Sequence, residues 1–345
     1  MKTKLQQHIL RLIIKMQAWL EHLRLKIVKK DFLRATEQDI YYSYRLFLNR
    51  RPDAGGFETY KRLINQAGGV RIDYLTDAFL YCAEQQELQA KRSQPVLVEL
   101  AEFQQYVRLN DHFIGAAIAR DKHYEVNVSQ VLRELLRPGI TFLDIGANIG
   151  YFSLLAAAHL ENTGRVIAFE PVAENRELFA LSVAVNDFQN IEIHPYAVSD
   201  HEAVVALEMG ARNSNSRMID PDLGSDVYQQ VKTVVLDHYL TDLNTLDIVK
   251  IDIEGAEPLA LKGMGELIEQ FRPLIITEFS PKLIVQTSQA NPESYLAALV
   301  ELGYTLAIID GSARETGILT LDQIMLQFEK EPGLAHLDLL ATPTH

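Results

Sequence analysis

The 345-residue chain is acidic, with 46 Asp and Glu against 33 Lys and Arg and a formal net charge of −13. This balance repels a phosphate backbone and argues against nucleic acid as a partner. Cys82 is the one cysteine, which excludes an intrachain disulfide and a cysteine-rich metal site and suits a reducing cytoplasm. No apolar run approaches the roughly 20 residues that span a bilayer, and the first segment lacks the cleavage site of a secretory signal.

Residues 1–30 are expected to form a basic amphipathic helix. Apolar residues recur there at helical spacing, and six Lys and two Arg against one Glu give the segment a net charge of +7. Such a helix either lies on an anionic membrane surface, with Trp19 at the interface, or packs on its own protein or a second copy. The predicted location is therefore the cytoplasm, with peripheral contact at the inner face of the membrane as the alternative.

Residues 31–95 are expected to form a small helical domain. The turn RRPDAGG separates its first two helices, and a third is predicted from Ile72 to Glu87. The run YRLFLNRRPDAGGFETYKRLI resembles a small helical domain of uncharacterised function found in bacterial surface and glycan-related proteins. Arg50, Arg51 and Asp53 are expected to cap and charge the corner between two helices, with a binding turn as the alternative.

From Thr141 onward, strand-like and helical runs alternate, so residues 141–345 are expected to be one α/β domain after a connecting helical segment at 96–140. Alternation of this kind predicts a parallel sheet with crossover helices. The expected strands cover 141–145, 165–170, 191–198, 247–253, 273–279 and 304–310, and the helices cover 151–160, 172–186, 257–271 and 292–302. The polar stretch 209–230 is predicted to be a long loop. Residues 212–217 within it are expected either to cover the substrate or to be an ordinary solvent-exposed segment.

The run FLDIGANIGYFS is the first candidate ligand site. A hydrophobic strand ends in Asp144, passes through Gly146, Asn148 and Gly150, and leads into a helix that begins near Tyr151. Glycines let a ligand approach the backbone, and the helix start offers unpaired N–H groups. A dinucleotide fingerprint has a glycine where Asn148 stands, and a carboxylate suits a cationic sulfonium better than a pyrophosphate. The motif therefore predicts S-adenosylmethionine rather than NAD.

Charged residues also stand at the ends of two further predicted strands. Glu170, in AFEP, follows Asp144 by 26 residues and is positioned to accept hydrogen bonds from a ribose diol, while Pro171 begins the next helix. In VKIDIEGAE, alternation places Lys250 and Asp252 on one face of a central strand. Charges there are costly unless they are paired or functional. The alternatives are an exposed strand-end carboxylate and an ion pair that only satisfies itself.

Together with NIEIHPYAVSD and the closing HLDLLATP, these motifs resemble the FkbM family of S-adenosylmethionine-dependent methyltransferases over about residues 120–342. The resemblance implies a Rossmann-like class I fold, a seven-stranded, mostly parallel sheet with one reversed strand, preceded here by an all-α region. It implies O-methylation of sugars or natural products. It also implies that the cofactor contacts Asp144, Gly146, Asn148, Gly150, Tyr151, Glu170, Pro171, Asn186, Ala197, Val198, Ser199 and Asp252.

Transfer of a methyl group to an alcohol needs a base and an oriented acceptor. Asp252 or Glu254 is expected to be the base, with Glu278 and Lys250 orienting the acceptor. His194 and His201 are rival bases. A divalent cation held by carboxylates is open but not predicted.

Three functions are weighed on this evidence. The first is O-methylation of a sugar, glycan or glycosylated metabolite. The second is N- or carboxyl-methylation of a peptide or small metabolite, and the third is a non-catalytic scaffold with a membrane-associated N-terminal helix. The first is the leading hypothesis, and the intact charged motifs argue against the third. A homo-oligomer stays open.

Overall fold

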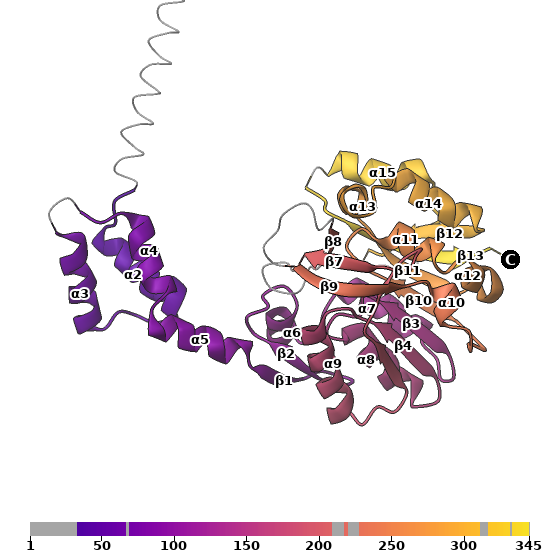
Figure 1. Ribbon diagram of the computed structural model, residues 1–345, viewed down its shortest axis with the longest axis horizontal. Coiled ribbons are helices and arrows are strands. Elements are labelled where there is room, and N and C mark those ends of the chain that lie inside the picture. The colour runs from indigo at the N-terminus through magenta and orange to yellow at the C-terminus, as the bar shows by residue number, and fades with distance from the viewer. Residues whose placement is uncertain are drawn as a thin grey trace, which may run out of the picture. The chain divides into compact units, whose positions relative to one another are not determined.

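The computed structural model describes residues 33–66, 69–208, 217–219, 228–310, 317–331 and 333–344, and Figure 1 traces them in chain order. The chain divides into two compact units, Met1–Arg92 and Ser93–His345, which are described separately. The helix predicted for residues 1–30 lies outside the described residues. Within the described part of the chain, no helix is both long and apolar enough to cross a bilayer.

The N-terminal unit is helical, as expected. Its elements are α2 (Glu37–Leu48), α3 (Ala54–Ile64), α4 (Ile72–Leu80) and α5 (Ala83–Ser93). Ile40, Leu75 and Phe79 are fully buried in its core. The prediction of a single helix from Ile72 to Glu87 is wrong, because the helical structure is interrupted between α4 and α5. There the sulfur of Cys82 accepts the Gln85 N–H at 3.4 Å and begins a new helix.

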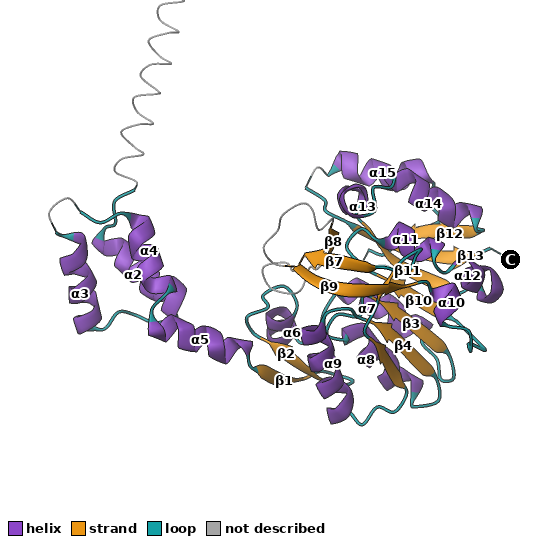
Figure 2. Ribbon diagram, viewed as in Figure 1, coloured by secondary structure: helices purple, strands orange, loops and turns teal. Residues whose placement is uncertain are grey.

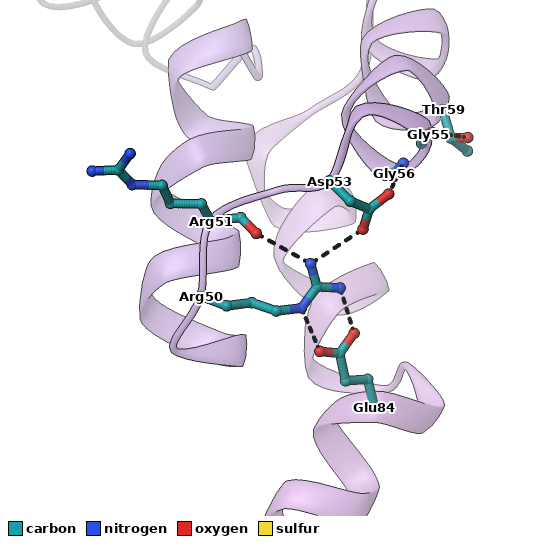
Figure 3. Close-up of polar contacts among 7 residues, drawn as sticks. All are labelled: Arg50, Arg51, Asp53, Gly55, Gly56, Thr59 and Glu84. Carbon is teal, nitrogen blue, oxygen red and sulfur yellow. Dashed lines mark hydrogen bonds and ion pairs between the residues drawn. The ribbon is translucent and has the colours of Figure 1, made fainter.

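Side chains of the RRPDAGG turn connect helices of this unit through ion pairs and hydrogen bonds (Figure 3). The Arg50 guanidinium donates to both carboxylate oxygens of Glu84, at 2.6 and 2.8 Å, and to Asp53 Oδ2 at 3.2 Å. Asp53 is also the N-cap of α3, since its Oδ1 accepts the Gly56 N–H at 2.7 Å. Figure 3 shows the Arg51 guanidinium pointing away from this network. Arg50 and Asp53 therefore charge and cap the corner as the sequence predicts.

The second unit is built on a seven-stranded sheet, which confirms the predicted fold class. Its strand order is β12-β13-β11-β10-β3-β4-β5. All neighbours are parallel except β13, which runs antiparallel to β11 and β12. The bounds are β3 Thr141–Ile145, β4 Arg165–Phe169, β5 Ile191–His194, β10 Ile248–Ile251, β11 Leu274–Phe279, β12 Tyr304–Ile308 and β13 Leu337–Pro343.

Helices cover both faces of the sheet, as Figure 2 shows in purple. Leu143 and Ile145 of β3 pack into one hydrophobic cluster and Phe142 into another, so the strand is buried on both sides. The helix predicted over 257–271 is two helices, separated at Gly263–Met264. The helices are α8 Tyr151–Leu160, α9 Ala173–Val185, α10 Leu236–Tyr239, α11 Glu257–Lys262, α12 Gly265–Phe271, α13 Pro281–Thr287, α14 Pro292–Glu301 and α15 Leu321–Lys330.

Residues 96–140 are not helical throughout, contrary to the prediction. They begin with a hairpin of β1 (Pro95–Glu99) and β2 (Gln104–Arg108), followed by α6 (Gly115–Asp121) and α7 (Val126–Leu135). Side chains of α9 hold β2, because Tyr106 N–H donates to Ser182 Oγ at 2.9 Å. This segment packs into the same cluster as α8, so it belongs to the second unit rather than linking two units.

The predicted long loop at 209–230 is also partly wrong. A small sheet of order β6-β9-β7-β8 runs through this region, with β6 at Ala197–Val198, β7 at Val204–Glu208, β8 at Arg217–Ile219 and β9 at Tyr228–Val234. Leu207 and Val231 pack with Val172 in a separate small cluster. Residues 209–216, and with them most of the predicted acceptor loop, lie outside the described residues.

Candidate active site

The turn after β3 is pressed against the loop after β10. Gly146 has φ of +86°, and a Cβ on it would lie 2.0 Å from the Asp252 carbonyl oxygen. The N–H groups of Gly146 and Ala147 both donate to Phe169 O, at 2.9 and 3.0 Å. Only glycine combines this backbone angle with this close approach. The glycine therefore lets the ends of β3, β4 and β10 meet.

Asp144 is buried beneath this turn. Its Oδ2 accepts a hydrogen bond from Ser153 Oγ at 2.6 Å, and it pairs in register with Lys250 of the neighbouring strand. Burial raises the pKa of Asp144, and the Lys250 ammonium opposes that rise. Gly150, with φ of +85°, has the Phe179 ring where a Cβ would be. Asp144 and Gly150 thus help to hold the turn in place.

Glu170 follows β4 and holds the same turn from the side. Its Oε2 accepts the Asn148 N–H at 2.8 Å, and its Oε1 accepts the Val172 N–H at 2.8 Å and Asn175 Nδ2 at 3.3 Å. Burial raises the pKa of Glu170 to about 7, although these hydrogen bonds favour the charged form. The carboxyl group is therefore preorganised by its neighbours rather than exposed at a strand end.

Lys250 and Asp252 form an ion pair at the end of β10. The distance from Nζ to Oδ2 is 2.7 Å, with the Lys250 side chain 5% and the Asp252 side chain 30% exposed. Lys250 Nζ also lies 4.7 Å from the centroid of the Phe152 ring. Burial alone would lower the pKa of Lys250, but the carboxylates of Asp252, Glu125 and Asp144 raise it above its usual value. The ammonium thus stays charged and fixes one oxygen of Asp252.

The loop that follows is bent by two left-handed residues, Glu254 with φ of +54° and Gly255 with φ of +93°. Glu257 Oε1 stabilises this bend by accepting the N–H groups of Ile253 and Gly255, at 3.0 and 3.1 Å. Burial raises the pKa of Glu257 to about 7. Glu257 therefore shapes the loop that carries Asp252 and Glu254.

The next two strands add a second group of titratable side chains. Glu278 of β11 pairs in register with Asp338 of β13, and its Oε1 lies 3.3 Å from His336 Nδ1. Burial, followed by the charge of Asp252, raises the pKa of both carboxyl groups. At a pKa of about 10, Glu278 keeps its proton and can donate as well as accept a hydrogen bond.

These side chains meet at a cavity of about 720 Å³. That volume lies in the range of about 300 to 1,000 Å³ that is typical of small-molecule and cofactor sites. Most of the predicted site residues line it, namely Gly146, Asn148, Tyr151, Glu170, Pro171, Ala197, Val198, Lys250, Asp252, Glu254 and Glu278. Residues far apart in the sequence are thus brought to the carboxyl ends of neighbouring strands.

Four predicted cofactor residues are not among the described lining residues: Asp144, Gly150, Asn186 and Ser199. Asn186 ends α9 and holds β2 instead, since its Oδ1 accepts the Gln104 N–H at 2.7 Å. The backbone N–H of Ser199 donates to Val234 O at 3.0 Å. Asn186 and Ser199 thus make structural contacts outside the described cavity lining.

The rival bases also lie apart from the described cavity lining. His194 stacks on Phe169 with ring centroids 4.9 Å apart, and its Nδ1 is 3.0 Å from Tyr239 Oη. Burial lowers the pKa of His194. His201 is exposed and lies 2.7 Å from Asp200. In the described part of the chain, no three His, Cys, Asp or Glu side chains converge on a point where a metal ion would be held.

Sequence reasoning missed several residues of the cavity. Phe113, Tyr124 and Glu125 come from the segment before β3, while His336 precedes β13 and Asp338 lies at its start. Asp338 is inside the HLDLLATP motif, but nothing in the sequence assigns it a role. Glu125 has no sequence signal at all, since it follows an ordinary polar stretch.

The sheet order with β13 reversed, and a cavity at the carboxyl ends of β3, β4 and β10, define the class of Rossmann-like methyltransferases that depend on S-adenosylmethionine. Residues 144–306 match the family model of the methyltransferase FkbM domain.

Several solved structures are similar. Methyltransferase FkbM from Methylobacillus flagellatus KT is 14% identical, with a TM-score of 0.37 over 84% of this chain and 71% of that one. A putative rRNA-methylase from Clostridium thermocellum is 6% identical, with a TM-score of 0.40 over 64% and 95%. Precorrin-6y C5,15-methyltransferase from Geobacter metallireducens GS-15 is 12% identical, with a TM-score of 0.36 over 62% and 88%. No curated protein matches the chain.

Proposed function

We propose that this methyltransferase acts on a hydroxyl group of a sugar, glycan or glycosylated metabolite, with Asp252 as the base. The observation that carries the proposal is the Lys250–Asp252 pair on the cavity wall. Lys250 is buried and fixes Oδ2, while the Asp252 side chain keeps 30% of its surface exposed. A carboxylate held in this way has one fixed oxygen and faces the space where an acceptor binds.

The cofactor end of the cavity fits S-adenosylmethionine, which supplies an electrophilic methyl group when bound. The carboxyl group of Glu170 is the acceptor for the ribose hydroxyls, because it lines the cavity and is oriented by Asn148 and Val172. Ala197 and Val198 present small apolar side chains on the same wall, as an adenine ring requires. Gly146 lines the same end of the cavity.

The remaining residues prepare the acceptor. Asp252 takes the hydroxyl proton as the oxygen attacks, and Glu254 on the same loop is the second candidate for this role. Glu278, with its raised pKa, donates a hydrogen bond to an acceptor oxygen. Lys250 keeps Asp252 in place and is a positioning residue. The proton thus moves from the acceptor to a carboxylate that the ammonium has already oriented.

The charge of the cavity supports a neutral acceptor. Six carboxyl groups line its described part, against the two ammonium groups of Lys250 and Lys282. Lys250 is already paired with Asp252. A carboxylate or phosphate on the acceptor would be repelled by those carboxyl groups that are ionised, whereas hydroxyl groups donate to and accept from carboxyl groups in either protonation state.

Asp252→Asn tests the proposal. The amide keeps the shape of the side chain but does not take up a proton, so we expect turnover to fall by about 10² to 10⁴. Binding of S-adenosylmethionine, measured by calorimetry, should stay within a few-fold. Glu269→Gln, on the exposed side of α12, is the control. Full turnover by Asp252→Asn with loss of turnover by Glu254→Gln would move the base to Glu254, and full turnover by both would reject a carboxylate base on this loop.

A further inference from the structure

Some residues that line the cavity lie inside the range that matches the family model, and others lie outside it. The turn after β3, Glu170 and the loop after β10 lie within residues 144–306, which match the FkbM domain. Two flanks outside this range complete the cavity, namely Phe113, Ile114, Tyr124 and Glu125 before it and Leu334, Ala335, His336 and Asp338 after it. The flanks add aromatic and carboxyl side chains to a cavity whose cofactor end is already formed without them.

Phe113 is held at the cavity by its backbone. The carboxylate of Asp111 accepts the N–H groups of Phe113 and Ile114, at 3.1 and 3.2 Å. Gly115 then packs so closely on β2 that an added Cβ would lie 2.3 Å from Arg108 O. The Phe113 side chain is nevertheless 66% exposed while it lines the cavity. A fixed turn thus presents an aromatic ring that the described residues leave mostly exposed.

Tyr124 and Glu125 are held just as firmly on the same flank. Ser129 bonds both backbone carbonyls, with Oγ donating to Tyr124 O at 2.7 Å and N–H donating to Glu125 O at 2.8 Å. The Tyr124 ring packs edge-on against Tyr151 of α8, with centroids 5.6 Å apart. Glu125 has φ of +38°, which a residue other than glycine rarely adopts.

The side chain of Glu125 lies in the same charge cluster as the proposed base. Burial raises its pKa, and its charge neighbours are the Lys250 ammonium and the carboxylates of Asp252 and Asp338. An ordinary helix start does not need a carboxyl group facing other carboxylates, and such burial is costly. A strained backbone that turns this group into a ligand cavity is the pattern expected of a binding residue.

We propose that Phe113 and Glu125 form a subsite for an uncharged pyranose ring, with Phe113 under its apolar face and Glu125 bonded to its hydroxyl groups. This proposal rests on the function proposed above and names the residues that would recognise the sugar. Axial and ring C–H groups give one side of a pyranose an apolar surface that suits an aromatic ring, while its edge carries hydroxyls that suit carboxyl groups. A uronate or sugar phosphate does not fit, because its charge would face the carboxyl wall.

The probes are methyl pyranosides of neutral hexoses and 6-deoxyhexoses, a methyl uronide and a methyl glycoside of an amino sugar. Each is incubated with the full chain and S-adenosylmethionine carrying a tritiated methyl group. We expect label in neutral pyranosides. Phe113→Ala should raise KM for the labelled pyranoside by about tenfold with kcat nearly unchanged, and Phe113→Trp should restore it. Glu125→Gln should raise KM as well. Affinity for S-adenosylmethionine should be unchanged in all three, which also shows that each variant is folded.

Two controls match these variants. Ile318→Ala removes a side chain of similar exposure, 72%, that does not line the cavity. Glu134→Gln removes a charge from the exposed end of α7. Both should leave KM unchanged. Methylated neutral pyranosides with wild-type KM in Phe113→Ala and Glu125→Gln would overturn the subsite and leave the proposed function intact. Label in the uronide or on the amine alone, or in none of the probes although S-adenosylmethionine binds, would overturn both.

Discussion

Glu170 is a buried carboxyl group that three donors already orient, from Asn148, Val172 and Asn175. Burial dominates these contacts and raises its pKa to about 7. The group therefore binds a proton more tightly in the folded protein than in the unfolded chain. This contribution to stability is present below the unfolded pKa and is lost as the pH rises through about 7. A ribose diol donates hydrogen bonds to the ionised form of Glu170, so cofactor binding would favour the ionised state over the protonated one.

This opposition predicts that affinity for S-adenosylmethionine rises with pH. Between about pH 6 and pH 8 the ionised fraction of Glu170 grows, and the dissociation constant should fall by about tenfold. Calorimetry at each pH measures it. Glu170→Gln should bind weakly at every pH and lose the dependence. Glu257→Gln is the matched control, because Glu257 also has a pKa of about 7 but does not line the cavity. An unchanged pH dependence in Glu170→Gln would assign the titration to another group.

At the scale of elements, the site is assembled where a turn and a loop touch. The backbone of Gly146, after β3, lies directly on the carbonyl of Asp252, after β10. Asp252 N–H in turn donates to Ile145 O at 3.0 Å, which extends the pairing of the two strands. Asp252 thus owes its position to the neighbouring turn as well as to its own strand.

Gly146→Ala should separate these two segments. Its φ of +86° already disfavours a side chain, and the added methyl group would meet Asp252 O. We expect the free energy of unfolding in urea to fall by about 2 to 4 kcal/mol and cofactor affinity to drop. Gly139→Ala is a close control, since Gly139 has the same φ with open space where its Cβ would be. Equal losses in the two variants would attribute the effect to backbone angle alone and not to contact with the β10 loop.

At the scale of the whole molecule, the chain consists of two units with separate cores. Ile40, Leu75 and Phe79 centre the core of the first. The described residues of the larger clusters all lie in the second, including the hairpin β1–β2. The cavity is likewise lined, in its described part, by residues of the second unit.

Residues 93–345 should therefore fold and bind S-adenosylmethionine without the first 92 residues. We expect the dissociation constant of this fragment to stay within about twofold of the full chain, because the truncation removes no lining residue. Calorimetry and thermal unfolding measure both properties. A fragment that starts at residue 141, the predicted domain boundary, should unfold, because it exposes the surface that β2 and α7 cover. Equal stability of the two fragments would contradict this role of residues 93–140.

The amino-acid sequence alone determined the fold class and identified several strand-end residues that lie at or beside the cavity. Asp144, Gly146, Glu170 and Asp252 each stand at the end of a strand, and a strand, its turn and the following helix form one local unit that pattern and turn chemistry reveal. Parallel strands bring such ends to one edge of the sheet, so the predicted residues meet without further information.

Tertiary structure alone decided the rest of the site. Glu125 and Asp338 are separated by most of the chain and approach Lys250 only because the folded chain brings the start of α7 and the start of β13 to the end of β10. The hairpin at 95–108 depends on pairing between β1 and β2, and the small sheet around β8 depends on pairing partners that a polar, turn-rich sequence does not identify. The resemblance assigns Asn186 to the cofactor, and only the folded structure shows that its Oδ1 accepts the N–H of Gln104 in β2. Contacts across the sheet, rather than local pattern, set which polar groups face the acceptor.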